Sequence, residues 1–471
     1  MLWVGVEYRG MGTRFRDYAP EQPHLLPPSP QDWLPEGHLA YLIRDLVQGL
    51  DLWAIHKTHW RNARGAPGFH PAMMVGILMY AWVNRVYSSR RIARLCVEDL
   101  GGRFLAAGHS PDFRTISLFQ LVHGEALADL FVQSVHLCQR AGLVSLRLVA
   151  GDGSKIEANA SKHKAMSYGR MVEQEAQLRG EIAELQRRGR QQDMEDDALF
   201  GKDVAGLDLP AELKRRETRL SHILAAKEAL EAEAKAAALA SQAEREAKER
   251  ERGKPLPGKK PKPPEEAKPA DKAQRGFTDP ESRIMKASGG EFIQAYNGQA
   301  VVDGDAQVIV ACDLTNQAAD APHFVPMMEQ VRENTGGTPE KIVADAGYFS
   351  EANAQYCPSP TSEVLISPDR LTHGSTEMPA QSASGVQSAS ARMAAQMREV
   401  LRTPEGHDTY ACRKKIVEPV FGQIKGCPGS PGFCHFLRRG LVKARQEWLW
   451  ACATHNFLKY LRYGRVCVVA G

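Results

Sequence analysis

The sequence predicts an α/β fold in which a helical region precedes the strands. Apolar residues recur at helical spacing within residues 35–140, and a β-rich run follows at residues 143–156. Strands then alternate with helices over residues 291–368. The chain has 471 residues, 43% of them hydrophobic and 25% charged, which is an ordinary globular composition for two or three domains.

Local sequence patterns exclude several classes of protein. The apolar run at residues 72–83 is much shorter than the roughly 20 residues of a membrane helix, so we expect no membrane partner. The first residues lack the pattern of a signal peptide, and Met11 offers a second start besides Met1. The nine cysteines form no CxxC pair, which favours free thiols in a reducing cytosol.

The N-terminal part divides into a Pro-rich tail at residues 1–34 and helices at residues 35–140. An apolar segment begins at Pro71. After it, Ser88 and Ser89 can cap a second helix whose first turn carries Arg90 and Arg91. This order is compatible with a helix-turn-helix that reads DNA, and equally with an ordinary helical hairpin.

The middle of the chain has a different composition. Residues 165–252 are rich in Ala, Glu, Lys, Arg and Gln, which favours long charged helices. A break at residues 201–210 divides them into two, as a hairpin or a mere spacer. The Pro/Lys-rich residues 253–275 predict an extended, mobile linker.

Four strands are expected in the second half, at residues 295–303, 308–314, 341–345 and 363–366. A helix lies between the second and third, and Asp320 can cap it. Residues 411–425 and 440–463 are expected to be helical, with His455 as a core histidine on the apolar stripe of the last helix.

Three carboxylates are candidates for metal-dependent chemistry. Asp152 and Asp345 each end an apolar strand, and Glu418 lies in a basic segment. A buried acid is costly unless it is paired or bound to a metal. Two acids on adjacent strands and a third from a helix can hold two divalent cations about 4 Å apart, which suits phosphoryl transfer with Mg²⁺. The alternative is that Asp152-Gly153 is only a turn.

Positive charge is concentrated near the C-terminus. Residues 410–465 contain eleven lysines and arginines but only two acids, Glu418 and Glu447. Such a surface favours a polyanion such as nucleic acid, although a solvated helix face is the other interpretation.

Six sequence blocks, in this order, resemble a known family: GDGSKIEANASKHKAMSY at 151–168, TDPESRIMK at 278–286, QAYNGQAVVD at 294–303, VADAGYFSEAN at 343–353, YACRKKIVEPVFGQIKG at 410–426 and FLRRGLVKARQEWLWACATHNFLK at 436–459. Together with HSPDFRTI at 109–116 they resemble bacterial insertion-sequence transposases of the DDE class. Within that class they are similar to the IS eleven-eighty-two group of the IS-four/IS-five assemblage.

The resemblance implies a ribonuclease H-like mixed sheet flanked by helices, with an N-terminal all-α domain and a long helical insertion after the first strand. Its catalytic and metal-binding triad falls on Asp152, Asp345 and Glu418. Two Mg²⁺ or Mn²⁺ ions are the implied cofactors. The implied domains are a DNA-binding or dimerisation domain at 35–140, a catalytic domain at 141–425 and a basic helical region at 426–471.

A second signature of the family falls on Tyr410, Arg413, Glu418 and Lys425 as DNA- or phosphate-binding positions. Arg413 is one residue further from Glu418 than in the commonest spacing, so Lys414 is an alternative phosphate ligand. Pro419 disfavours a continuous helix, which places Glu418 near a fresh helix start. Further basic residues are expected to supply sequence-independent affinity for DNA: Arg438, Arg439, Lys443 and Arg445.

The function implied is a bacterial, cytoplasmic, nucleoid-associated transposase. It would cut double-stranded DNA at the terminal inverted repeats of an element and join the ends to target DNA, as a homodimer on DNA. Two rivals remain: a metal-dependent nuclease of the same fold, and an inactive DNA-binding relic acting as a repressor. The unusual segments 427–435 and 369–400 are compatible with a decayed copy.

Overall fold

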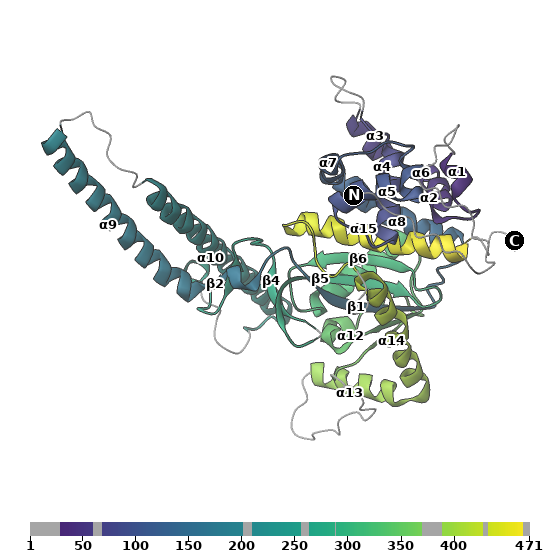
Figure 1. Cartoon of the computed structure of the whole chain (residues 1–471). Helices are drawn as coiled ribbons and strands as arrows, with labels where there is room; N and C mark the ends of the chain where they lie inside the picture. The colour runs from purple at the N-terminus through teal and green to yellow at the C-terminus, as the bar shows by residue number, and fades with distance from the viewer. Residues whose placement is uncertain are drawn as a thin grey trace, which may run out of the picture.

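The structure is a computed structural model that describes residues 29–59, 68–200, 210–255, 263–287, 289–369, 389–426 and 432–464 (Figure 1). Several sequence predictions fall outside these residues: most of the N-terminal tail and its alternative start, the break at 201–209, the centre of the Pro/Lys linker at 256–262, and the segments 370–388 and 427–431.

The N-terminal region is helical, as predicted. Its helices are α1 (Pro30–Trp33), α2 (Leu39–Gln48), α3 (Trp53–His59), α4 (Pro71–Val83), α5 (Ser89–Glu98), α6 (Leu100–Leu105), α7 (Phe113–Val122) and α8 (Gly124–Arg140). Pro71 opens α4, where its missing N–H would have no partner, and the His70 side chain caps that end. Helix α4 is buried along almost its whole length, whereas Arg90 and Arg91 on α5 are exposed.

A mixed sheet follows these helices. Its strands are β1 (Leu148–Glu157), β4 (Arg283–Lys286), β5 (Phe292–Asp303), β6 (Ile309–Thr315), β7 (Lys341–Ala344) and β8 (Glu363–Ile366). The order across the sheet is β6-β5-β1-β7-β8, with β4 also paired to β5. β5 and β6 are antiparallel to their neighbours, while β1, β7 and β8 run parallel. The four strands expected in the second half are confirmed, and the arrangement is compatible with a ribonuclease H-like domain.

Strand β1 does not end at Asp152-Gly153, as the turn pattern predicted. It continues to Glu157 because residues 149–157 all pair with the antiparallel neighbour β5, including Asp152 with Ala300. The parallel neighbour β7 stops earlier, at Ala344 opposite Gly151. Asp152 therefore lies where β1 loses one of its two partners, which leaves one side of the strand open.

The segment between β1 and β4 forms a two-helix arm. Helices α9 (Tyr168–Phe200) and α10 (Pro210–Arg252) project from the sheet side by side (Figure 1). A small apolar core joins them, with Met171 and Leu178 facing Ile223 and Leu230. The short strands β2 (Ala165–Ser167) and β3 (Gln274–Gly276) pair at its base, so the C-terminal end of the expected linker is a strand.

The C-terminal helices complete one continuous core. Helix α11 (Phe324–Thr335) contacts β5 and β6, and α12 (Glu351–Ala354) contacts β8. Helices α13 (Ala389–Arg402) and α14 (Pro404–Lys425) pack together. Helix α15 (Leu441–Lys459) lies between the N-terminal helices and the sheet (Figure 1), and its residues from Glu447 to Phe457 are buried. The C-terminal helix therefore packs into the core, as its apolar stripe predicted, and its exposed basic residues lie in its first turns.

Helix α14 is continuous through Pro419, contrary to the expected break. A proline cannot donate to the carbonyl four residues earlier, which here belongs to Lys415. The side chain of Gln307 donates to that carbonyl instead, with Nε2 3.0 Å from the oxygen. Glu418 consequently lies in the interior of a long helix.

Within the described residues, no single helix is long and apolar enough to cross a membrane. Helices α7 and α8 have the necessary length and composition only when taken together, and the pair is bent by 70°.

Candidate functional site

Two of the predicted acids lie at the same edge of the sheet. In the parallel pairing of β1 with β7, Gly151 is opposite Ala344, and Asp152 and Asp345 each follow by one residue. Asp345 accepts a hydrogen bond from the N–H of Gly347 at 2.9 Å, and Asp152 from that of Gly153 at 2.8 Å. The register of two adjacent strands therefore brings these carboxylates together.

Helix α14 supplies a counter-charge. Arg413 Nη1 lies 3.2 Å from Asp152 Oδ2, and its guanidinium is 5.9 Å from the centre of the Tyr410 ring. Arg413 Nε is buried and has no hydrogen-bond partner among the described residues, so one of its donors is unused. The spacing left Arg413 and Lys414 as alternatives. Arg413 forms the ion pair with Asp152, whereas Lys414 is exposed.

Burial dominates the electrostatics of the pair. It raises the pKa of Asp152 to about 7, with a further rise from Asp345 and an opposing effect of Arg413. Burial likewise raises the pKa of Asp345, which Arg413 again opposes. Two adjacent acids with perturbed pKa values are typical of a functional site.

Lys425 lies at the other end of this helix. Its Nζ donates to the backbone oxygen of Lys155 on β1 at 2.8 Å. Burial, followed by the neighbouring positive charge of Lys155, lowers the pKa of Lys425 to about 8. The predicted positions Tyr410, Arg413 and Lys425 thus all face β1 and its neighbours from α14.

Glu418 is the predicted site residue that the structure does not bring to the aspartates. Its side chain is exposed, and it makes no hydrogen bond or ion pair with any residue that the structure describes. It lies seven residues before Lys425 and hence on the same side of α14.

Asp320 is a third acid near the pair, and the sequence reasoning assigned it only a capping role. Its side chain makes no cap hydrogen bond to the helix. Instead, Asp320 Oδ1 accepts hydrogen bonds from Asn297 Nδ2 at 2.6 Å and Gln299 Nε2 at 2.8 Å, and Lys155 Nζ lies 3.2 Å away. The feature that indicates this role is the pair of fully buried amides on β5, because a buried amide needs a hydrogen-bond partner.

Several basic residues after α14 make contacts within the protein. Arg438 is largely buried beside Glu447 and donates to the backbone oxygen of Gln120 at 3.0 Å, so the expectation that it binds DNA is not supported. Arg445 pairs with Asp313. Arg439 is exposed and donates to the backbone oxygen of Asn159 at 3.1 Å.

The donor set suits a hard divalent cation. Over the described ranges, no three His, Cys, Asp or Glu side chains lie close enough to hold a metal ion by themselves. Mg²⁺ does not require such a cage, since it commonly takes one or two carboxylates and completes its shell with water and phosphate oxygens. Asp152 and Asp345 provide two carboxylates at an open strand edge, so they fit Mg²⁺ or Mn²⁺.

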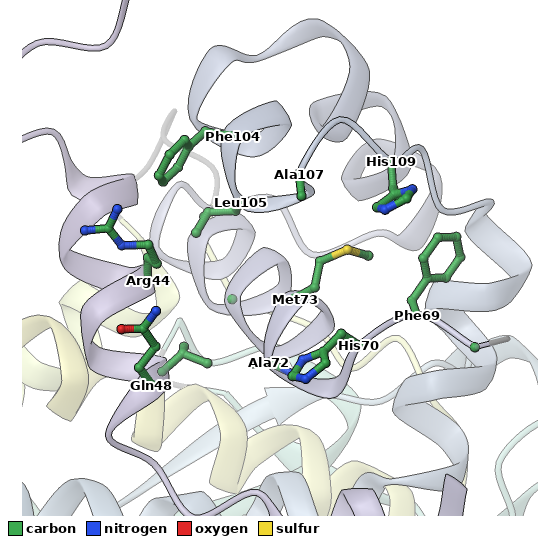
Figure 2. Close-up of a pocket in the computed structure, with 13 residues that line it drawn as sticks. Arg44, Gln48, Phe69, His70, Ala72, Met73, Phe104, Leu105, Ala107 and His109 are labelled. Atoms are coloured by element: carbon green, nitrogen blue, oxygen red, sulfur yellow. The ribbon is translucent and has the colours of Figure 1, made fainter. Parts of the chain in front are cut away.

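A pocket of about 810 Å³ lies elsewhere, among the N-terminal helices. Figure 2 shows Arg44 and Gln48 of α2 on one side, with Met73 of α4, Phe104 and His109 around the opening. None of the aspartates borders it, and its lining contains no acid. It is therefore separate from the candidate site.

Two regions of the chain match known protein families. Residues 254–457 match the model of a transposase DDE domain, and residues 28–120 match a transposase domain, DUF772. No curated protein and no solved structure matches the chain significantly. The two matches together support a DDE-type insertion-sequence transposase.

Proposed function

We propose that this chain, in which a transposase domain precedes a DDE domain, is a DNA transposase that cuts transposon ends and joins them to target DNA in a metal-dependent reaction. The observation that carries the proposal is the register of β1 and β7, which places Asp152 beside Asp345 at an open edge. The matched families support DNA as the substrate. The finer placement in the IS eleven-eighty-two group is part of the proposal.

Asp152 and Asp345 are the proposed metal ligands. When bound, divalent ions supply activation of the attacking oxygen and stabilisation of the entering and leaving oxygens at phosphorus. Two ions, Mg²⁺ or Mn²⁺, are the proposed cofactors. Glu418 is the proposed third carboxylate of the family's triad, although it is exposed on α14.

The residues of α14 act on the phosphate in this proposal. Arg413 already opposes the charge of Asp152 and retains an unused donor, so it can stabilise negative charge that develops on a phosphate oxygen. Lys425 donates to the backbone oxygen of Lys155 and is thereby fixed against β1, the strand that carries Asp152. Tyr410 packs under the Arg413 guanidinium and orients it.

The proposed partners are the terminal inverted repeats of an element and a target duplex. Two ends must be cut for one element to move, which favours a homodimer on DNA. We place the enzyme in the bacterial cytoplasm, associated with the nucleoid. The domain division at residues 34, 140 and 425 is likewise proposed. One hydrophobic core runs through the N-terminal helices, the sheet and α15.

The test uses the full chain and a plasmid that carries the DNA flanking its reading frame on both sides of a marker. Nicking in Mg²⁺ or Mn²⁺ and the joining of a labelled 3′ end to a second plasmid are measured separately. Asp345→Asn is the active-site variant. Asp408→Asn is the matched control, because Asp408 is a strongly exposed acid on α14 that pairs with its neighbour His407.

Joined products that depend on Asp345 but not on Asp408 support the transposase. Cleavage without joined products favours the rival nuclease. Binding to the flanking repeats without cleavage in either metal favours the inactive relic.

A further inference from the structure

The side chain of Asp320 is held by three donors from the sheet, although it makes no cap hydrogen bond to the turn that follows it. It begins the short 3-10 turn Ala321–His323 that leads into α11, and its side chain is mostly buried. Asn297, Gln299 and Lys155 all direct their donors at a single oxygen of this carboxylate, Oδ1. Two of these donors come from β5 and one from β1, so the strands of the site fix its position.

The other oxygen of Asp320 is left without a donor and faces Asp345. Oδ2 accepts no hydrogen bond from the described residues. A side-chain carbon placed on Gly347 would lie 3.1 Å from this oxygen, 3.0 Å from Asp345 Oδ1 and 3.6 Å from Asp345 Oδ2. The absence of a side chain at position 347 therefore keeps open a space that is bordered by carboxylate oxygens of two residues.

Carboxylate oxygens that border one space repel each other unless a cation or a proton lies between them. The neighbouring cations form their ion pairs elsewhere, although Arg413 and Lys155 also lower the pKa of Asp345: Lys155 lies at the opposite oxygen of Asp320, and Arg413 lies at Asp152. Oxygen ligands at a partly open position are what Mg²⁺ and Mn²⁺ bind.

We propose that Asp320 is a further metal-binding carboxylate of this site, which acts together with Asp345 across the space that Gly347 leaves open. The proposal rests on the proposed function, because it assigns a residue to the metal site of that reaction. In it, the Asn297, Gln299 and Lys155 side chains are positioning residues that hold Asp320 with one oxygen toward Asp345. An exposed Glu418 is then not needed for the first ion to bind.

The test measures binding of Mn²⁺ to the full chain without DNA, by the electron paramagnetic resonance signal of free Mn²⁺, together with the unfolding temperature without metal. Asp320→Asn removes the charge and keeps the size and the acceptor of the side chain. Gly347→Ala removes no charge but fills the space. The controls are Asp408→Asn, an exposed acid outside the site, and Gly180→Ala on the arm, where an added carbon meets nothing within 4 Å.

We expect Asp320→Asn and Gly347→Ala each to weaken Mn²⁺ binding by on the order of tenfold or more, as Asp345→Asn does, while both controls bind like the wild type. We also expect Asp320→Asn to unfold at the same or a higher temperature without metal, since an amide can donate to Asp345. A lower unfolding temperature with unchanged Mn²⁺ affinity would show that Asp320 is only structural.

Failure here can be told apart from failure of the proposed function. If Asp345→Asn loses Mn²⁺ while Asp320→Asn binds it normally, the role of Asp320 is overturned and the transposase remains. If the wild type binds no Mn²⁺, the Asp320 inference is overturned, and the cleavage assay decides independently whether the chain acts on DNA.

Discussion

Arg413 on α14 and Asp152 on β1 form an ion pair at 3.2 Å, although 261 residues separate them in the sequence. Both side chains are mostly buried, at 12% and 20% exposure. An acid in such a place is unstable without a compensating charge, because burial alone favours its protonated form. The pair therefore fixes α14 against the sheet, and Arg413 opposes the rise that burial causes in the pKa of Asp152.

Replacing Arg413 should affect the reaction far more than replacing its neighbour. We expect Arg413→Ala to slow nicking in Mg²⁺ by roughly 10²-fold, the usual effect of losing one preorganised electrostatic donor. Lys414→Ala should slow it no more than about threefold, since Lys414 is exposed and makes no ion pair with the aspartates among the described residues. Rates are measured at saturating DNA. Equal losses in the two variants would contradict the assignment of Arg413.

Lys425 should contribute to chemistry rather than to DNA affinity. Its ammonium is fixed on the backbone of β1 and is mostly buried, so it cannot act as a mobile surface charge. We expect Lys425→Ala to reduce nicking at least tenfold while DNA affinity changes less than threefold. A variant that loses both in proportion would place Lys425 among the general DNA contacts.

The sequence predicted the parts of the site that depend on local pattern. Apolar runs that end in an acid identified Asp152 and Asp345, and their meeting follows from the parallel pairing of two strands. Asp320 was missed because its partners are buried amides on β5, and only the folded sheet shows that those amides converge on it. Charge counting failed for Arg438, because a count cannot tell a buried ion pair from a surface charge.

The local sequence pattern also could not predict that α14 is continuous. Pro419 predicts a break from sequence, whereas the structure repairs the lost backbone hydrogen bond with a side chain from a distant turn, Gln307. Such a compensation depends on tertiary contact and leaves no signal in the helix itself. The prediction was wrong for that reason.

This compensation can be measured with a double-mutant cycle. We expect Gln307→Ala to lower the free energy of unfolding by about 1 kcal/mol, because the Lys415 carbonyl loses its donor. Pro419→Ala should raise the free energy of unfolding by up to about 3 kcal/mol, since it restores the backbone donor. In the Pro419→Ala background, the cost of Gln307→Ala should become smaller. Strictly additive effects in urea denaturation would rule out the coupling.

The contribution of His455 to stability should fall in mild acid. Burial lowers the pKa of His455 to about 4, and its Nε2 lies 2.9 Å from the backbone oxygen of Gln307. Between pH 6.5 and about 4, the unfolded chain binds a proton at this residue and the folded chain does not. Stability from this group is therefore complete above pH 6.5 and decreases as the pH falls, by roughly 1.4 kcal/mol per pH unit.

The measurement is the free energy of unfolding in urea at several pH values between 4 and 7. His455→Gln removes the titrating group and keeps a side chain that can donate to the same carbonyl. As the pH falls from 6.5 to about 4, the wild type should lose stability relative to this variant. Parallel curves for the two proteins would show that His455 does not control the acid response.

Arg438 and Arg439 are adjacent in sequence, but replacing them should change different properties of the protein. Arg438 lies beside the buried carboxylate of Glu447, which also accepts the N–H groups of Leu437 and Arg438. We expect Arg438→Ala to lower the free energy of unfolding by about 3 kcal/mol, because it leaves Glu447 buried without a counter-charge. Adding Glu447→Gln should restore part of that stability, since the amide carries no charge.

Lys443 is exposed, and Arg439 is exposed while it donates to the backbone oxygen of Asn159. Both can contact a phosphate backbone. We expect Arg439→Ala and Lys443→Ala to change stability by less than about 0.5 kcal/mol. Each should instead reduce the slope of log affinity against log salt by about one unit, on any DNA sequence, because one phosphate contact is lost. The folded fraction of Arg438→Ala, isolated at low temperature, should keep the wild-type slope. If all three variants share the wild-type slope, DNA approaches the aspartates from another face, and these basic residues only keep the surface hydrated.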